Sequence, residues 1–212
     1  MKFATKALRV GLRENGLVVT PSRAVIQPIY QSSTFAWNSL DDIPAIDYTR
    51  CQNPNRKSLE EVIAALENGT HATLYASGMA AIGAAFSYLK QGDHLLMADD
   101  IYGGTFRLAE KWLPRQGVTT SGFCAHDPLT IRDAVTENSR MLIFETPTNP
   151  NLRVSDIAAV CEEAHRHGLV VVFDNTFASP ALQNPLDLGA DIVVHSTTKY
   201  IAGHSDVIGG AT

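Results

Sequence analysis

A single amine follows an apolar stretch near the end of the chain, in the sequence VVHSTTKYIAGHSD at residues 193–206. Lys199 comes directly after three hydroxyl residues, and glycines, a histidine and an aspartate follow it. A dry pocket or positive neighbours lower the pKa of a lysine, which can then attack a carbonyl group. The stretch favours a nucleophilic lysine, whereas the ordinary interpretation is a solvated charge at the end of a strand.

Other chemically capable residues follow the apolar runs upstream. Asp174 follows VVVF, Tyr102 comes shortly after LLMAD, and Ser77, Gly78 and Met79 follow TLYA. Each has an ordinary structural interpretation when taken alone. An aspartate after a strand is often a helix N-cap, a lone tyrosine is more often part of the packing, and Ser-Gly-Met suits a plain turn.

Together these residues are the parts of a site for pyridoxal 5′-phosphate. The free N–H groups and the dipole of a helix N-terminus bind phosphate, and the hydroxyl groups of Ser196 and Thr198 complete such a cradle. Tyr102 is placed to stack on a planar ring, and Asp174 to keep a pyridine nitrogen protonated. Lys199 would form a Schiff base with the cofactor, which acts as an electron sink.

Two other site types share parts of this pattern. Residues 196–199 read S-x-x-K, as in serine acyl-enzymes, but the Ser-Asp-Asn and Lys-Thr-Gly partners of that motif are absent. A nicotinamide-binding domain would need G-x-G-x-x-G after its first strand, and the sequence has none there. His165 and His167 would face different sides of a helix, and the other histidines lack ligand spacing, so we expect no metal.

Strands and helices are predicted to alternate from residue 58 onward. Helices are predicted over 58–68 with Ser58 as N-cap, 78–92, 103–117, 127–138, and 155–168 with Ser155 as N-cap. Strands are predicted over 71–77, 94–100, 119–125, 139–147, 169–176 and 190–197. Continuous apolar strands of this kind are typical of an α/β fold with a mainly parallel sheet and helices on both faces. Ligands bind such sheets at the carboxyl ends of the strands, so we expect one site along that edge.

Residues 1–57 show little periodicity and are rich in Pro, Ser, Asn and Thr, which predicts an extended arm ahead of a domain at 58–212. The chain has 212 residues, 45% hydrophobic and 18% charged, enough for a sizeable core. Its net charge of −5 and scattered charges argue against nucleic-acid and membrane partners.

Cysteine usage and the N-terminus bear on the compartment. The chain has three widely spaced cysteines, Cys51, Cys124 and Cys161, an odd number that favours free thiols in a reducing compartment. The first residues contain no continuous apolar segment of the secretory kind, and we expect a cytoplasmic protein.

The sequence resembles the trans-sulfuration group of pyridoxal-phosphate enzymes, which act in cysteine and methionine metabolism. The stretch DNTFASPALQNPLDLGADIVVHSTTKYIAGHSDVIGG is similar to their cofactor-lysine region, and VIQPIYQSSTF and DYTRCQNPNR extend the resemblance to the N-terminus. The branch of cystathionine γ-synthase and γ-lyase looks closest. The resemblance implies a type I fold and γ-replacement or γ-elimination on substrates of the cystathionine, homoserine ester or cysteine class.

The resemblance also implies roles for individual residues. Lys199 matches the lysine that holds the cofactor and moves protons, and Asp174, with Thr176 beside it, matches the acid on the ring nitrogen. Tyr102 matches the stacking ring, which also helps in proton transfer. Asn149, in ETPTNP, matches the residue near the phenolic oxygen of the cofactor and the carboxylate of the substrate.

The remaining matches concern the phosphate and the oligomer. Gly78 and Met79 match backbone phosphate donors, as Ser196 and Thr198 match hydroxyl donors. Tyr48 and Arg50, in DYTRCQNPN, match a pair that reaches the phosphate of a neighbouring subunit, which implies a homo-oligomer, a dimer of dimers in this family.

In the family, the cofactor domain continues beyond the point that matches Thr212, and a C-terminal domain follows with the arginine that binds the carboxylate of the substrate. The sequence is therefore interpreted as the N-terminal portion of such an enzyme, whose last strand, in DVIGGAT, would have an exposed edge. A catalytically inactive fragment that binds the cofactor or a partner is the alternative.

Overall fold

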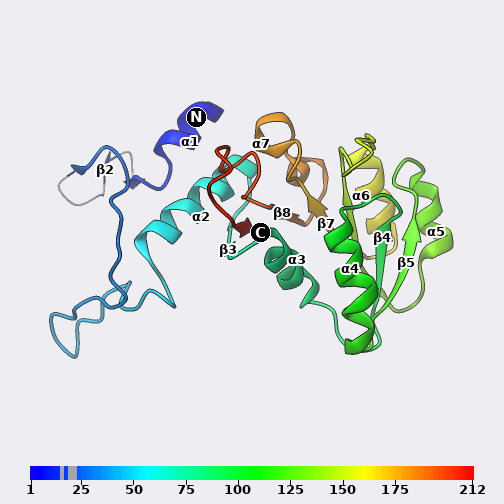
Figure 1. Ribbon diagram of the computed structural model, residues 1–212, viewed down its shortest axis with the longest axis horizontal. Helices are drawn as coiled ribbons and strands as arrows, with labels where there is room; N and C mark the ends of the chain where they lie inside the picture. The colour runs from blue at the N-terminus through cyan, green and yellow to red at the C-terminus, as the bar shows by residue number, and fades with distance from the viewer. Residues whose placement is uncertain (15–16, 19–22) are drawn as a thin grey trace. The chain divides into compact units, whose positions relative to one another are not determined.

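The computed structural model describes residues 1–14, 17–18 and 23–212 (Figure 1). Part of the predicted arm, residues 15–16 and 19–22, lies outside the described residues. The chain divides into two compact units, Met1–Ala72 and Thr73–Thr212. In the described parts, no helix has the length and apolar character needed to cross a membrane.

The described residues of the N-terminal unit form the helices α1 (Phe3–Arg9) and α2 (Pro54–Glu67) and a short antiparallel pair, β1 (Arg13–Glu14) with β2 (Leu17–Val18). The Lys6 amine on α1 donates to the carbonyl of Ala65 at 2.8 Å and to the side chain of Asn68 at 2.7 Å. Residues 24–53 contain no helix and form only isolated bridges, Thr34 with Tyr48 and Ser39 with Asp42.

The predicted N-cap of α2 is wrong by five residues. Asn53, not Ser58, is the N-cap, and its side chain accepts the N–H of Asn55 at 2.8 Å. Pro54 occupies the first helical position, where its missing N–H costs nothing. Asn68 ends the helix in the left-handed conformation, and Gly69 follows it.

The C-terminal unit is built on a five-stranded parallel sheet, as the apolar strands predict. Its order is β5-β4-β6-β7-β8, and the strands are β4 (His94–Ala98), β5 (Thr119–Phe123), β6 (Ser139–Glu145), β7 (Val170–Asp174) and β8 (Ile192–Val194). The mixed α/β class with a mainly parallel sheet is confirmed.

Helices cover both faces of this sheet (Figure 1). Alternate strand residues point to opposite faces, so Leu96, Phe144 and Phe173 pack with α5 (Ile131–Ala134) and α6 (Ile157–Arg166). Their strand neighbours Leu95, Ile143 and Val172 pack with α3 (Gly78–Phe86) and α4 (Gly103–Lys111). The two buried clusters explain why each strand is apolar throughout.

Several predicted helices are shorter in the structure. Pro114 lies in a separate 3-10 turn, Leu113–Gln116, after α4 has ended at Lys111. A second 3-10 turn, Pro128–Thr130, precedes α5, and two further short elements, α7 (Ser179–Leu182) and the turn Pro185–Leu188, lie between β7 and β8. Proline cannot donate a backbone hydrogen bond, which favours these breaks.

The N-cap predicted for α6 is also wrong. Asp156 caps it by accepting the N–H of Ala159 at 3.0 Å. Ser155 is engaged elsewhere, since its hydroxyl lies 3.3 Å from the Nδ1 of His126 and its N–H donates to the hydroxyl of Thr146 at 2.9 Å.

The first predicted strand of the domain is short and lies outside the parallel sheet. It is β3 (Leu74–Tyr75), which pairs antiparallel with β9 (Gly210–Ala211). On its other side, Ala211 exchanges backbone hydrogen bonds with His195, at 2.8 and 3.0 Å. The expected exposed edge of this last strand is therefore wrong, because β9 is paired on both sides.

Candidate active site

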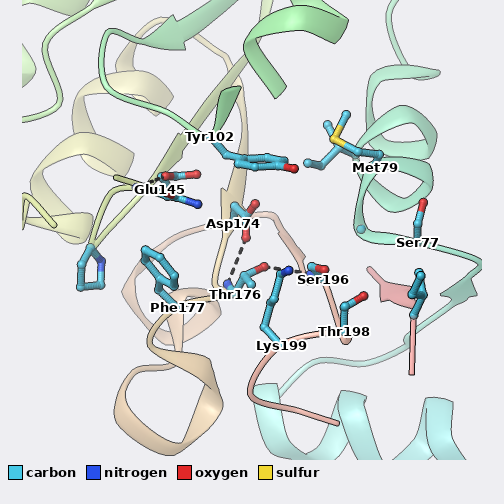
Figure 2. A pocket seen from close by; sticks show the side chains of 15 residues that line it. Ser77, Met79, Tyr102, Glu145, Asp174, Thr176, Phe177, Ser196, Thr198 and Lys199 are labelled. Carbon is cyan, nitrogen blue, oxygen red and sulfur yellow. Dashed lines mark hydrogen bonds between the residues drawn. The ribbon is translucent and has the colours of Figure 1, made fainter. Parts of the chain in front are cut away.

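The order of the sheet reverses between β4 and β6, because the chain runs outward from β4 to β5 and then returns to add β6, β7 and β8 on the other side. A ligand crevice is expected at such a reversal, outside the carboxyl ends of the strands. A pocket of about 220 Å³ lies there (Figure 2). The residues lining it are Ser77, Gly78, Met79, Ile82, Tyr102, Glu145, Pro147, Asn149, Asp174, Thr176, Phe177, Ser196, Thr198, Lys199 and Ile208.

The structure brings most of the predicted site residues together in this pocket. They come from five separate segments, and they are Gly78, Met79, Tyr102, Asn149, Asp174, Thr176, Ser196, Thr198 and Lys199. Tyr48 and Arg50 belong to the N-terminal unit, where the Arg50 guanidinium lies 4.9 Å from the centre of the Tyr48 ring.

Asp174 is the last residue of β7, and it lines the pocket. It accepts the backbone N–H of Thr176 at 3.0 Å, and the side chain of Thr176 also hydrogen-bonds to it. Burial raises the pKa of Asp174, and the hydrogen bonds from Thr176 and the nearby His195 only partly oppose this. A cationic group bound against Asp174 would stabilise its charged form.

Lys199 is carried by the turn that follows β8. Its backbone N–H donates to the carbonyl of Ser196 at 3.2 Å, and the N–H of Ser196 donates to the Thr176 hydroxyl at 2.8 Å. The second bond joins the segments that follow β7 and β8, and the Lys199 side chain points toward Asp174 and Ser196 (Figure 2). The acid and the amine therefore face the same cavity.

The N-terminus of α3 borders the pocket at very close range to Ser196. A Cβ atom added at Gly78 would lie 2.7 Å from the Ser196 Cβ, so only glycine fits between them. The Ser77 hydroxyl caps the helix by accepting the N–H of Ala80 at 3.1 Å. A helix start of this kind presents free N–H groups and a positive dipole to an anion.

The Thr198 hydroxyl has partners within the chain. It donates to the carbonyl of Gly209 at 3.2 Å and accepts the N–H of Gly209 at 3.1 Å. Thr198 therefore holds the segment ahead of β9 in place, and a phosphate donor role would require this hydroxyl to turn away from Gly209.

Tyr102 follows β4, and its ring lies across the pocket from Lys199 (Figure 2). A Cβ at Gly104 would lie 2.4 Å from the ring and 2.7 Å from the Met79 sulfur, so the absence of a side chain at Gly104 lets the ring pack against Met79. The ring is thus held beside the helix start that borders the same pocket.

Glu145 is a pocket residue that the sequence analysis missed. It ends β6, is 4% exposed, and accepts the backbone N–H of Asn149 at 2.6 Å. Burial is the main reason that its pKa rises to about 7, and the negative charge of Asp174 adds to the effect. The available signal was a carboxyl group at the end of the otherwise apolar run MLIFE. Phe177 also lines the pocket and was likewise not assigned to the site.

Comparisons with known proteins give related enzymes over nearly the whole chain. A probable cystathionine gamma-synthase of Herpetosiphon aurantiacus is 45% identical over 209 residues, which are 99% of this chain and 64% of that protein. The cystathionine beta-lyase MetC of Bacillus subtilis is 47% identical over 187 residues, which are 88% of this chain and 48% of that protein.

Solved structures agree with these relatives. The crystal structure of metB from Corynebacterium glutamicum superposes with a TM-score of 0.92 at 40% identity, and that of cystathionine gamma-lyase from Lactobacillus plantarum, complexed with L-serine, with 0.89 at 42%. This chain is covered completely by both and spans 54% of each. The family described as Cys/Met metabolism PLP-dependent enzyme matches residues 4–212. This chain therefore belongs to the Cys/Met metabolism family of pyridoxal-phosphate-dependent enzymes.

Proposed function

We propose that this chain forms the cofactor-binding part of an enzyme that makes or breaks carbon–sulfur bonds in sulfur amino acids. The reaction is γ-replacement or γ-elimination on a substrate of the cystathionine, homoserine ester or cysteine class. The observation that carries the proposal is the convergence of Lys199, Asp174 and the α3 N-terminus on one pocket. The names of the related proteins, cystathionine synthases and lyases, support the substrate class.

The residues present fit pyridoxal phosphate. The glycine at position 78 lets the start of α3 approach Ser196 closely at the edge of the pocket. A phosphate group bound in the pocket there would accept hydrogen bonds from the N–H groups of Gly78 and Met79 and from the hydroxyl of Ser196. Asp174, whose pKa is raised by burial, suits a protonated ring nitrogen that would supply the missing positive charge. Bound in this way, the cofactor supplies an electron sink for the bonds broken at the substrate.

The other pocket residues act on the ring and on the substrate. The Tyr102 ring, which packs against Met79, would stack on the planar ring of the cofactor. Thr176 orients the Asp174 carboxylate through its two hydrogen bonds. The Lys199 Nζ is the group that would hold the cofactor covalently, and it is the base that would take the α-proton of the amino acid. Asn149 lies where it can bind the carboxylate of the substrate.

The functional form is a cytoplasmic homo-oligomer, in which Tyr48 and Arg50 reach the phosphate of a neighbouring subunit. The N-terminal unit supports this arrangement because Val25, Ile26 and Ile29 are each at least 70% exposed. The alternative function, a cofactor-binding chain without turnover, uses the same pocket.

Borohydride reduction of the chain with pyridoxal phosphate, followed by peptide mass mapping, tests the site. The pyridoxyl group should be found on Lys199, and Lys199→Ala should not be labelled at any residue. A label on another lysine, such as Lys90, would contradict the assignment. Assays of cystathionine cleavage and γ-replacement then separate an enzyme from a cofactor-binding chain without turnover.

A further inference from the structure

Two loops meet at the reversal of the sheet, the one after β4 (residues 99–102) and the one after β6 (residues 146–156). The first carries Tyr102 and the second carries Asn149, and both side chains line the pocket. The position of the ring relative to the amide therefore depends on how firmly these two loops are joined.

Asp100 joins the β4 loop to the β6 loop. Its carboxylate accepts the hydroxyl of Thr148 at 2.7 Å and the side-chain amide of Asn151 at 2.9 Å, and the Arg153 Nε lies 3.7 Å away. The Thr148 hydroxyl also accepts the backbone N–H of Arg153 at 3.0 Å, so the loop is closed on itself around this contact. One carboxylate from the β4 loop thus organises the whole turn that carries Asn149.

Glu145 makes the reverse connection. It belongs to β6, yet it accepts the backbone N–H of Tyr102 from the β4 loop as well as the N–H of Asn149. A 4%-exposed carboxyl group close to Asp174 is costly to bury, and its two backbone donors offset part of that cost. The burial of a carboxyl group at residue 145 is explained if the protein needs these two contacts to the backbone of Tyr102 and Asn149.

We propose that Asp100 and Glu145 are a reciprocal pair of positioning residues, each binding the loop that follows the other's strand and together fixing Tyr102 relative to Asn149. This inference rests on the proposed function, because Tyr102 and Asn149 matter only if the pocket takes the cofactor and an amino acid. Asp100 is not among the residues that line the pocket and acts through the loops, whereas Glu145 both holds the two loops and borders the pocket.

Amide hydrogen exchange in the cofactor-free chain tests the connection directly. In Glu145→Gln, one backbone donor faces an amide NH₂ group, and protection at the N–H groups of Tyr102 and Asn149 should fall about tenfold. In Glu137→Gln, a change to an exposed carboxylate before the start of β6, protection should be unchanged. Protection of both amides at the original level in Glu145→Gln would overturn the proposal.

Two further variants test the contacts that Asp100 makes with the loop after β6. Asp100→Asn weakens the contacts to Thr148 and Asn151, and Thr148→Val removes one of them without changing the acid, which keeps the test open if Asp100→Asn fails to fold. Both variants should lower the exchange protection of the Arg153 and Tyr102 N–H groups. Asp99→Asn, a change at the exposed neighbouring acid, should leave this protection unchanged. Unchanged exchange in both Asp100→Asn and Thr148→Val would contradict the pairing.

A second readout links the pair to the cofactor. Circular dichroism of bound pyridoxal phosphate reports the placement of its ring, and this signal should weaken in Glu145→Gln and Asp100→Asn, with about tenfold weaker cofactor binding. The controls Glu137→Gln and Asp99→Asn should keep both the circular dichroism signal and the affinity for the cofactor. If the original chain binds no pyridoxal phosphate but the exchange results hold, the proposed function fails and the pairing stands. If the cofactor binds and these variants keep its signal and affinity, the positioning role fails.

Discussion

Single residues at the pocket carry charges that are costly to bury in the cofactor-free chain. Asp174 and Glu145 are carboxyl groups at the ends of adjacent parallel strands, and burial raises the pKa of both. A structure selected only for stability would place apolar residues or a buried cation there. The presence of both carboxyl groups is explained if a positively charged group of a ligand binds next to them, since stability is often reduced at functional sites.

Asp174→Asn should therefore have opposite effects on binding and on stability. The amide cannot stabilise a protonated ring nitrogen, so affinity for pyridoxal phosphate should fall about tenfold or more. At pH 7, the free energy of unfolding of the cofactor-free variant should equal or exceed that of the original chain, because a buried carboxylate has been removed. Titration with the cofactor and urea unfolding check the two effects. The exposed Asp206→Asn serves as control, and a large loss of stability in Asp174→Asn would contradict the argument.

The free energy of unfolding should depend on pH through Glu145. Its pKa in the folded chain is raised to about 7, so between pH 4.5 and 7 the folded state binds more protons than the unfolded state. Stability is then lost as the pH rises through this range, by on the order of 3 kcal/mol. Asp174 and Asp100 are the acids whose charges add to the effect.

Urea unfolding of the cofactor-free chain at several pH values measures this slope. Glu145→Gln should flatten the slope between pH 4.5 and 7. Asp174, whose pKa is raised by burial, and His94, whose pKa is lowered by burial, contribute to the remaining slope with opposite signs. An identical pH dependence in the variant would show that Glu145 does not titrate in this range.

At the scale of elements, the sequence predicts the strands and the edge where the site lies, because a buried parallel strand is apolar up to the point where it meets the ligand. Helix starts were less predictable, since Ser58 and Asn53, like Ser155 and Asp156, are both good N-caps. In the second case the Ser155 hydroxyl contacts the ring of His126, 29 residues away in the sequence, and no local pattern contains this contact. Glu145 was missed for the same reason, because its donors come from two loops.

The pairing of β3 with β9 is another long-range feature, and it places Gly210 against the start of α3. A Cβ at Gly210 would lie 2.1 Å from the Ser77 carbonyl oxygen and 2.8 Å from the Gly78 nitrogen. Both atoms belong to the backbone, so neither can move without shifting the helix start. The last strand therefore helps to shape the proposed phosphate site.

Gly210→Ala should destabilise the chain by about 1–3 kcal/mol, the usual cost of overpacking, and should weaken the binding of pyridoxal phosphate. Gly83→Ala, within α3, is the matched control, because a Cβ there meets nothing within 4 Å and alanine favours the helix by about 0.5–1 kcal/mol. Thermal unfolding and cofactor titration distinguish the two. Equal behaviour of the variants would mean that β9 does not constrain the helix start.

At the scale of the whole molecule, the two units have different chemistry. The C-terminal unit holds a pocket for a cofactor, whereas the N-terminal unit has exposed apolar residues and the stacked pair of Tyr48 and Arg50. An arginine held over a tyrosine ring keeps its N–H donors available for an anion. A subunit that lends Arg50 to its partner would make each site depend on two chains.

Mixing two inactive variants tests this dependence. Arg50→Ala keeps the lysine of its own pocket, and Lys199→Ala keeps the arginine that would reach the pocket of a partner. Random exchange of equal amounts makes about half of the dimers hybrid, each with one intact site, so about one quarter of all sites should recover cofactor binding. The matched control mixes Arg50→Ala with a double variant that carries both Lys199→Ala and Arg50→Ala. This mixture contains no Arg50 and should show no recovery. Absence of recovery in the first mixture, with exchange verified by mass spectrometry of the dimers, would show that Arg50 does not complete the site of a partner.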